Sequence, residues 1–327
     1  MNELINSAFK APRILRNANL QTALAVLGRY RFKAAIYWEE LALPDGDFVD
    51  LVWLGNQVEG PIAILIPGLE GGLHAPYIAS LVDPLLAESW RVVVVHFRSC
   101  SGRINSLPRG YSANDSDDLE LIVASLRMQN PGITMVAIGF SLGASILLKM
   151  LEGHSDLKFP NDYITAAVGV SVPYDLGLTV DYIPAFYQGW MLRSMKAKVK
   201  QKMDAGFDLP ISLEQLKAIK TLREFDTLIT APLHEFPTVD AYYEGSSCGK
   251  DLDKIKSDTL LIHALDDPLV PKSCIPTSES LGERTRLELS PNGGHLGFLS
   301  SHFPWCWRRW LTQRIVEFVR PYIGDNE

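Results

Sequence analysis

Short apolar runs recur along the chain, and each is bounded by glycine, proline or charged residues. Their length and their content of branched residues are typical of strands that are buried on both faces of a sheet. These runs lie at residues 62–66, 92–97, 135–138, 166–172 and 259–264. Helical patterns such as 144–151 separate them. The alternation predicts an α/β fold with a mostly parallel central sheet that is flanked by helices.

The segment 175–256 breaks this alternation. It contains helical stretches at 189–203 and 212–222 but no strong strand pattern, and strands resume at Thr259. We therefore predict a single domain, 1–327, with a helical cap or lid insertion, 175–256, after its sixth strand.

Three further segments complete the predicted elements. Residues 41–53 alternate around a Pro-Asp-Gly turn, which predicts an antiparallel hairpin. Residues 13–33 predict a helix packed on the body, with an interfacial membrane helix as the alternative. The apolar positions of 307–322 fit one face of a final helix.

A G-x-S-x-G pentapeptide, 139–143, stands between a predicted strand and a predicted helix. This order is typical of a nucleophile elbow, in which a serine sits on a sharp turn with its hydroxyl exposed. We predict that Ser141 is the nucleophile. The alternative is a glycine-rich turn in which Ser141 only caps the helix.

A serine nucleophile needs a general base and a carboxylate that orients the base. The carboxylate is expected next in chain order and the histidine last. Asp266 and Asp267 follow the strand 259–264, and their side chains point in opposite directions if the backbone is extended. We favour Asp267, which precedes Pro268, and expect Asp266 to bond nearby backbone amides.

His295 is the predicted base because it lies in a glycine-rich loop after the last strand. Among the seven histidines, His263 lies inside an apolar strand and is expected to be a satisfied core residue. His96 ends a strand, and we expect it to be structural or to line the pocket. His154 and His234 fall in loops with no partner pattern, and His302 lies too deep in the C-terminal segment.

Two backbone N–H groups are predicted to form an oxyanion hole. One belongs to Leu142, the residue after the nucleophile, and the other to Leu69 in the glycine-rich loop after the strand 62–66. An ordinary strand-to-helix loop is the alternative for 67–72.

Four residues are predicted to contribute to the substrate pocket. His74 lies near the proposed oxyanion loop, and Phe140 precedes the nucleophile. Tyr182 and Phe186 belong to an aromatic cluster of the insertion, which also includes Tyr187 and Trp190. This cluster either lines an acyl pocket or packs the insertion onto the body.

Several motifs together resemble the YheT-like branch of the α/β-hydrolase superfamily, which is related to the mammalian ABHD1/ABHD3 proteins. The matching stretches are 19–22, 43–47, 67–71, 97–102, 139–143 and 294–298. The resemblance implies a triad of Ser141, Asp267 and His295 and carboxylic-ester hydrolysis, sometimes of acyl lipids. The chain departs from the family pattern at Asn19, where a histidine is usual, and at Ser99, where a glycine is usual. Pro67 replaces the usual histidine of the oxyanion loop.

Composition narrows the possible partners and location. The net charge of −7 and the absence of a long basic run argue against nucleic-acid binding. The four cysteines form no C-x-x-C pair, so no metal is expected, and no organic cofactor is implied. The absence of a signal-peptide pattern at the start and of a long apolar segment indicates a cytoplasmic protein. The aromatic stretch 303–310 allows membrane contact, although packing of a final helix is favoured.

These observations predict a serine esterase that acts on a small ester or an acyl lipid through an acyl-enzyme. A lipase, thioesterase or amidase that uses the same triad is the alternative, because a fold does not settle the reaction. A non-catalytic ligand-binding relative is a further alternative.

Overall fold

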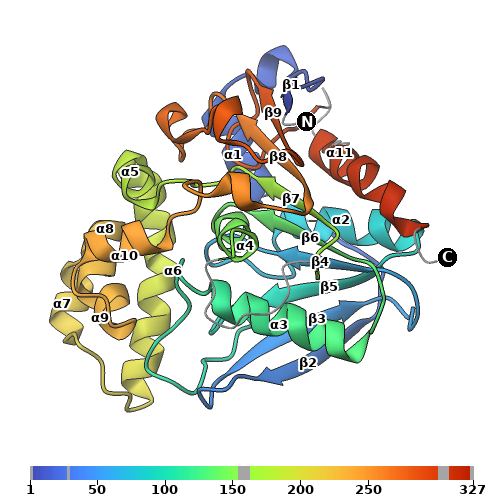
Figure 1. Ribbon diagram of the computed structural model, residues 1–327. Helices are drawn as coiled ribbons and strands as arrows, with labels where there is room; N and C mark the ends of the chain where they lie inside the picture. The colour runs from blue at the N-terminus through green and yellow to red at the C-terminus, as the bar shows by residue number, and fades with distance from the viewer. Residues whose placement is uncertain (1–2, 28–29, 154–162, 301–308, 325–327) are drawn as a thin grey trace.

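The computed structural model describes residues 3–27, 30–153, 163–300 and 309–324 (Figure 1). Its centre is a nine-stranded sheet with the order β1-β9-β8-β7-β6-β4-β5-β3-β2. Neighbouring strands are parallel except for β2–β3 and β3–β5, so β3 runs against the rest of the sheet. The strands are β1 (Glu3–Asn6), β2 (Ile36–Ala42), β3 (Phe48–Leu54), β4 (Ile62–Ile66), β5 (Arg91–His96), β6 (Met135–Phe140), β7 (Ala166–Val170), β8 (Asp258–Ala264) and β9 (Thr285–Ser290).

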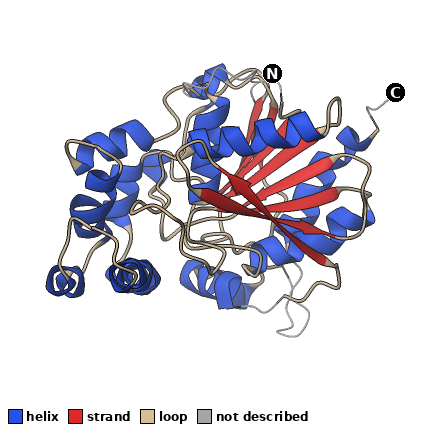
Figure 2. Ribbon diagram, turned by 90° about the horizontal axis from the view of Figure 1, so that it is seen from below, coloured by secondary structure: helices blue, strands red, loops and turns tan. Residues whose placement is uncertain are grey.

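Helices cover both faces of this sheet and also fill the segment between β7 and β8. The body helices are α1 (Ala18–Leu27), α2 (Pro76–Ala87), α3 (Ser116–Gln129), α4 (Leu142–Leu151) and α11 (Trp310–Val319). The insertion between β7 and β8 contains α5 (Leu176–Tyr182), α6 (Ala185–Asp204), α7 (Leu213–Ala218), α8 (Leu222–Phe225), a π-helical turn (Asp226–Thr230), α9 (Ala231–Leu233) and α10 (Val239–Ser246). The insertion helices gather to one side of the sheet (Figures 1 and 2).

Alternating strand residues divide the core into two layers. On β4, Ala63 and Leu65 pack with helices α1, α2 and α11, whereas Ile62, Ile64 and Ile66 pack with α3 and α4. Successive side chains of a strand point to opposite faces, so a continuous apolar run is needed where both faces are covered. The α/β class and the mostly parallel sheet predicted from sequence are confirmed, and so is the hairpin, which is formed by β2 and β3.

Several predicted elements differ in detail. Glu3–Asn6 forms an unexpected edge strand paired with β9, so the strand predicted as sixth is β7. The helix expected over 212–222 ends at Ala218, and a capping box of Thr221 and Glu224 starts α8 at Leu222. The helix expected over 13–33 is reduced to a 3₁₀ turn, Arg13–Leu15, and α1.

Some predictions fall on residues that the structure does not describe. His154, His302 and most of the aromatic stretch 303–310 lie there, as does the expected start of the final helix at Trp307. The helices in the described part of the chain include none long and apolar enough to cross a membrane.

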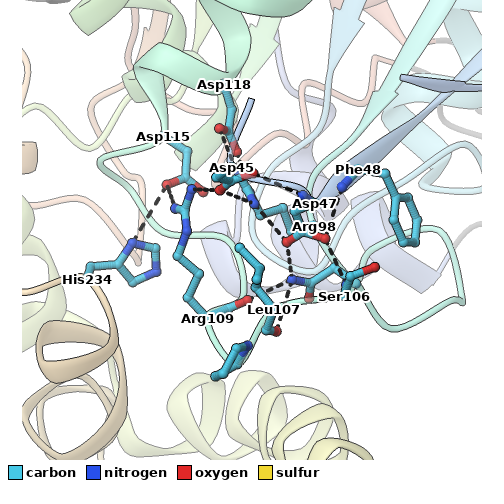
Figure 3. A network of polar contacts seen from close by, with 12 residues as sticks. Asp45, Asp47, Phe48, Arg98, Ser106, Leu107, Arg109, Asp115, Asp118 and His234 are labelled. Atoms are coloured by element: carbon cyan, nitrogen blue, oxygen red, sulfur yellow. Dashed lines mark hydrogen bonds and ion pairs between the residues drawn. The ribbon is translucent and has the colours of Figure 1, made fainter. Parts of the chain in front are cut away.

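A buried ion cluster ties the β2–β3 turn to the body (Figure 3). The Arg98 guanidinium follows β5 and donates to Asp118 of α3 at 2.6 and 2.7 Å. It also donates to Asp47 at 2.7 Å and lies 2.9 Å from Asp45. Arg98 is 1% exposed. Arg109 also pairs with Asp45 and extends the cluster to Asp115, 3.7 Å away. A charge this deeply buried is stable only while its partners remain in place.

We predict that Arg98→Met lowers the free energy of unfolding by about 3–5 kcal/mol, because it leaves the buried carboxylates of Asp47 and Asp118 without their cation. Urea unfolding measures this change. Arg320→Met, which breaks an ion pair with Glu88 on the surface, serves as the control and should leave stability near the wild-type value. Equal effects of the two substitutions would contradict this role for Arg98.

Candidate active site

Three side chains that are distant in sequence meet beyond the carboxyl ends of the central strands. His295 Nε2 lies 2.8 Å from Ser141 Oγ, and His295 Nδ1 lies 2.8 Å from Asp267 Oδ2. Ser141 follows β6, Asp267 follows β8 and His295 follows β9. The carboxyl ends of parallel strands share one edge of a sheet, so the topology brings these three loops together.

The turn at Ser141 has an unusual backbone. Ser141 has φ +50° and ψ −122°, and its N–H donates to the Val170 carbonyl at 2.9 Å. Two glycines allow the turn to be this tight. A Cβ on Gly139 would lie 2.6 Å from Ala144 Cα, and one on Gly143 would lie 2.2 Å from the Pro67 carbonyl oxygen. The glycines of the pentapeptide are therefore required by close backbone approach.

Asp267 is buried and held by more than the histidine. Its Oδ1 accepts the N–H groups of Leu269 at 2.8 Å and Val270 at 3.2 Å. Burial would raise the pKa of Asp267, but His295 and these amides outweigh burial and hold the pKa below its usual value. This carboxyl is thus ionised at neutral pH. Asp266 instead accepts from the Gly294 N–H at 2.9 Å and from the Asn292 side chain, so it joins the loop after β9 rather than the nearby backbone amides expected for it.

One histidine adjoins Asp267, and another supports the loop after β4. His263 is fully buried in β8, with Nε2 3.9 Å from Asp267 Oδ2, and burial lowers its pKa to about 4. The expectation that it is a satisfied core residue is wrong in one respect, since neither ring nitrogen has a hydrogen-bond partner among the described residues. His96 is structural: its Nε2 accepts the Leu73 N–H at 3.0 Å and supports the loop after β4.

The loop after β4 lies against the turn at Ser141. A Cβ on Gly68 would come within 3.1 Å of Ser141 Cβ. The N–H groups of Gly68 and Glu70 donate to the hydroxyls of Tyr77 and Tyr111, at 3.2 and 2.8 Å. Between them, the Leu69 N–H makes no hydrogen bond to any described residue, and neither does the Leu142 N–H at the start of α4. Two donors on the segments flanking Ser141 thus remain available to a ligand.

A cavity opens from Ser141 and His295 into the insertion. Its interior volume is about 170 Å³. Its lining is mostly apolar, and the insertion contributes many of the apolar side chains. These residues include Val180, Ile183, Met191, Met195, Val199, Leu222, Phe225 and Ile229. Polar lining lies beside Leu69, where Lys198 of α6 donates to Glu70 at 2.9 Å.

The four expected pocket residues do not line this cavity. Phe140 is buried in the core against Tyr77, with ring centroids 4.9 Å apart. His74 is exposed, and Tyr182 and Phe186 are 50% and 80% exposed. Tyr182 and Phe186 therefore lie on the outer side of α5 and α6. Aliphatic residues and methionines of these helices line the cavity instead.

Sequence reasoning missed the apolar lining of α6. Met191, Met195 and Val199 follow one another at intervals of four residues, so they share one face of the helix. That spacing could have predicted an apolar cavity face on α6. The prediction relied instead on the aromatic residues of the insertion. In the described part of the chain, no group of three or more His, Cys, Asp or Glu side chains could hold a metal ion.

A family model described as "alpha/beta hydrolase fold" matches residues 61–301. The chain belongs to this family. The YheT protein of Escherichia coli (strain K12) is 36% identical over 98% of this chain and 96% of its own length. Phospholipase ABHD3 of Mus musculus is 27% identical over 81% of this chain and 67% of its own length. The resemblance to the YheT-like branch is therefore confirmed.

Solved structures agree on the fold. Esterase Pf2001 of Pyrococcus furiosus superposes with a TM-score of 0.56 at 18% identity, covering 91% of this chain and 98% of that one. At this identity the likeness supports the α/β-hydrolase fold alone.

We predict that Gly143→Ala lowers the free energy of unfolding by about 1–3 kcal/mol, because its Cβ would overlap the Pro67 carbonyl. Urea unfolding measures the change. Gly189→Ala on α6 has open space around its Cβ and should instead stabilise the helix by up to about 1 kcal/mol. A neutral Gly143→Ala would show that the turn is not tightly packed.

Proposed function

We propose that the protein hydrolyses carboxylic esters, with Ser141 as nucleophile, His295 as general base and Asp267 as the acid that orients the base. One observation carries the proposal. An unbroken chain of two 2.8 Å contacts runs from Asp267 through His295 to the Ser141 hydroxyl, at the mouth of an apolar cavity. A serine hydroxyl becomes a nucleophile at neutral pH only when an adjacent base takes its proton.

The reaction proceeds in two acyl transfers. His295 Nε2 accepts the Ser141 proton as Oγ attacks the ester carbonyl, and the same nitrogen then protonates the departing alcohol. Water then attacks the acyl-enzyme. His295 Nε2 takes a proton from this water and returns it to Ser141 Oγ as the acid leaves. The ionised Asp267 carboxylate stabilises the imidazolium that forms in each step and keeps Nδ1 protonated.

The N–H groups of Leu69 and Leu142 hold the negative oxygen of the tetrahedral intermediate. Both are free to donate within the described structure, and both belong to backbone that packs against Ser141. Donors fixed in advance by the fold need no reorganisation when the charge develops, so they lower the barrier directly. The macrodipole of α4, which begins at Leu142, adds positive potential at the same place.

The 175–256 insertion acts as the cap of this site and receives the acyl group. Its apolar lining suits a hydrocarbon chain, and mouse ABHD3, a relative, is named a phospholipase. The substrate class is therefore an acyl ester, including esters of lipids. Thioesters and amides would meet the same groups, and a matched panel of esters, thioesters and amides of one acyl chain ranks them.

We predict that Ser141→Ala abolishes hydrolysis of p-nitrophenyl butyrate and labelling by a fluorophosphonate probe, since it removes the attacking oxygen. Ser145→Ala provides the control. Ser145 lies in the first turn of α4, which begins after Ser141, and is buried, but its hydroxyl faces the Pro173 carbonyl and Cys248. Both variants should retain the wild-type circular dichroism spectrum.

Hydrolysis retained by Ser141→Ala would remove the assignment of the nucleophile. A folded wild-type protein that the probe does not label would instead favour a ligand-binding relative without catalysis.

We predict that Ile229→Phe lowers kcat/KM for a p-nitrophenyl decanoate by about tenfold relative to the acetate, because the larger side chain fills the acyl cavity. Leu228→Phe is the matched control. Leu228 is the adjacent residue of the same π-helical turn, but it is 36% exposed and does not line the cavity. Unchanged chain-length preference in Ile229→Phe would place the acyl group elsewhere.

A further inference from the structure

His295 sits in a loop whose backbone is unusual. Gly294, Leu296 and Phe298 have φ of +58°, +61° and +45°. Residues other than glycine rarely adopt positive φ. Such a loop persists only when its surroundings over-determine it. The position of the His295 imidazole therefore depends on whatever holds this backbone.

Helix α1 supplies much of that support. Thr22 Oγ1 accepts the N–H of His295 itself at 2.9 Å. Gln21, which is fully buried, pairs with the backbone of Leu299 in both directions. Its Oε1 accepts the Leu299 N–H at 2.9 Å, and its Nε2 donates to the Leu299 carbonyl at 3.2 Å.

Two glycines close to His295 in the sequence permit this close approach. A Cβ on Gly294 would lie 2.5 Å from the Ala18 carbonyl oxygen and 2.8 Å from Thr22 Oγ1. A Cβ on Gly297 would lie 2.7 Å from Gln21 Oε1. The glycine-rich sequence around His295 thus serves contact with α1 as well as the bend of the loop.

We propose that α1 is a positioning element of the active site and that the Thr22 hydroxyl is the group that sets the backbone of His295. The inference rests on the proposed function of His295. Because the matched family region begins at residue 61, α1 lies outside it. The contact is made by the N-terminal segment, which carries the stretch 19–22 and packs on the region that the family model matches.

The Thr22 hydroxyl can donate its own proton and accept the His295 N–H at the same time. Thr22 Oγ1 donates its proton to the Ala18 carbonyl at 2.8 Å, so a lone pair faces the His295 N–H. Thr22 is 2% exposed, so water does not replace the bond readily. Valine has the same shape without an acceptor and would leave this N–H unpaired, whereas serine keeps the acceptor.

Other contacts hold neighbouring residues of the loop. Asp266 accepts the Gly294 N–H, and Ser171 Oγ accepts the Leu296 N–H at 3.3 Å. Neither contact involves the backbone N–H of His295, and the described partner of that N–H is Thr22. Loss of this bond should let the imidazole shift relative to Ser141 and Asp267 while the loop stays attached.

Steady-state kinetics of Thr22→Val with p-nitrophenyl butyrate test the inference. We expect kcat to fall by about 10- to 100-fold, because small displacements of a catalytic group have effects of this size. KM should stay near the wild-type value, because Thr22 does not line the substrate cavity. Thr22→Ser should restore kcat.

Thr259→Val is the matched control for loss of a buried threonine hydroxyl. Thr259 Oγ1 donates to the Ser257 carbonyl at 3.0 Å, near the start of β8 and at the opposite end of that strand from Asp267. It should reduce thermal stability without lowering kcat.

Wild-type kcat in a folded Thr22→Val, or failure of Thr22→Ser to restore a lowered kcat, would overturn the inference. If Thr22→Val does not fold, amide hydrogen exchange in the wild-type protein decides. The His295 N–H should exchange slowly, and rapid exchange would overturn the proposal. A wrong proposed function gives a different result from a wrong role for Thr22. In that case the wild-type protein would neither hydrolyse esters nor react with the fluorophosphonate probe at Ser141.

Discussion

One imidazole holds the candidate site together. Both ring nitrogens of His295 are engaged, one with the Asp267 carboxylate and the other with the Ser141 hydroxyl. The three residues follow three different strands, so this contact requires the order and the parallel direction of β6, β7, β8 and β9. A hydrogen bond tolerates displacements of only a few tenths of an ångström, and the sheet is the rigid element that meets this demand.

The loops at this edge store backbone strain. Glu70, Ser141, Leu296 and Phe298 all have positive φ. Each such residue costs of order 1–3 kcal/mol and is kept only by its surroundings. The supports are visible: Glu70 is bonded to Tyr111, Ser141 to the backbone of β7, and the His295 loop to α1. The packed body thus maintains backbone conformations that aim the reacting groups.

The insertion is attached to the same loops. Lys198 joins α6 to Glu70, the neighbour of a proposed oxyanion donor. Lys202 donates to the carbonyls of Leu107, Pro108 and Arg109 at 2.7, 3.0 and 2.8 Å, and burial lowers its pKa to about 8. Tyr187 donates to Asn19, a position where the family usually has histidine. The insertion therefore contacts the loop after β4, the segment 107–109 and α1.

The sequence by itself determined the features that depend on near neighbours in the chain. The apolar runs identified the parallel strands, and the pentapeptide 139–143 together with chain order identified Ser141, Asp267 and His295 as candidates, because strand periodicity and a tight glycine turn are local properties. Only the tertiary structure decided which face of α5 and α6 meets the cavity, since that depends on how the helices pack against distant segments. It placed Tyr182 and Phe186 outside and Met191 and Met195 inside. It also decided that Thr22 bonds His295, a contact across 273 residues that no local pattern encodes.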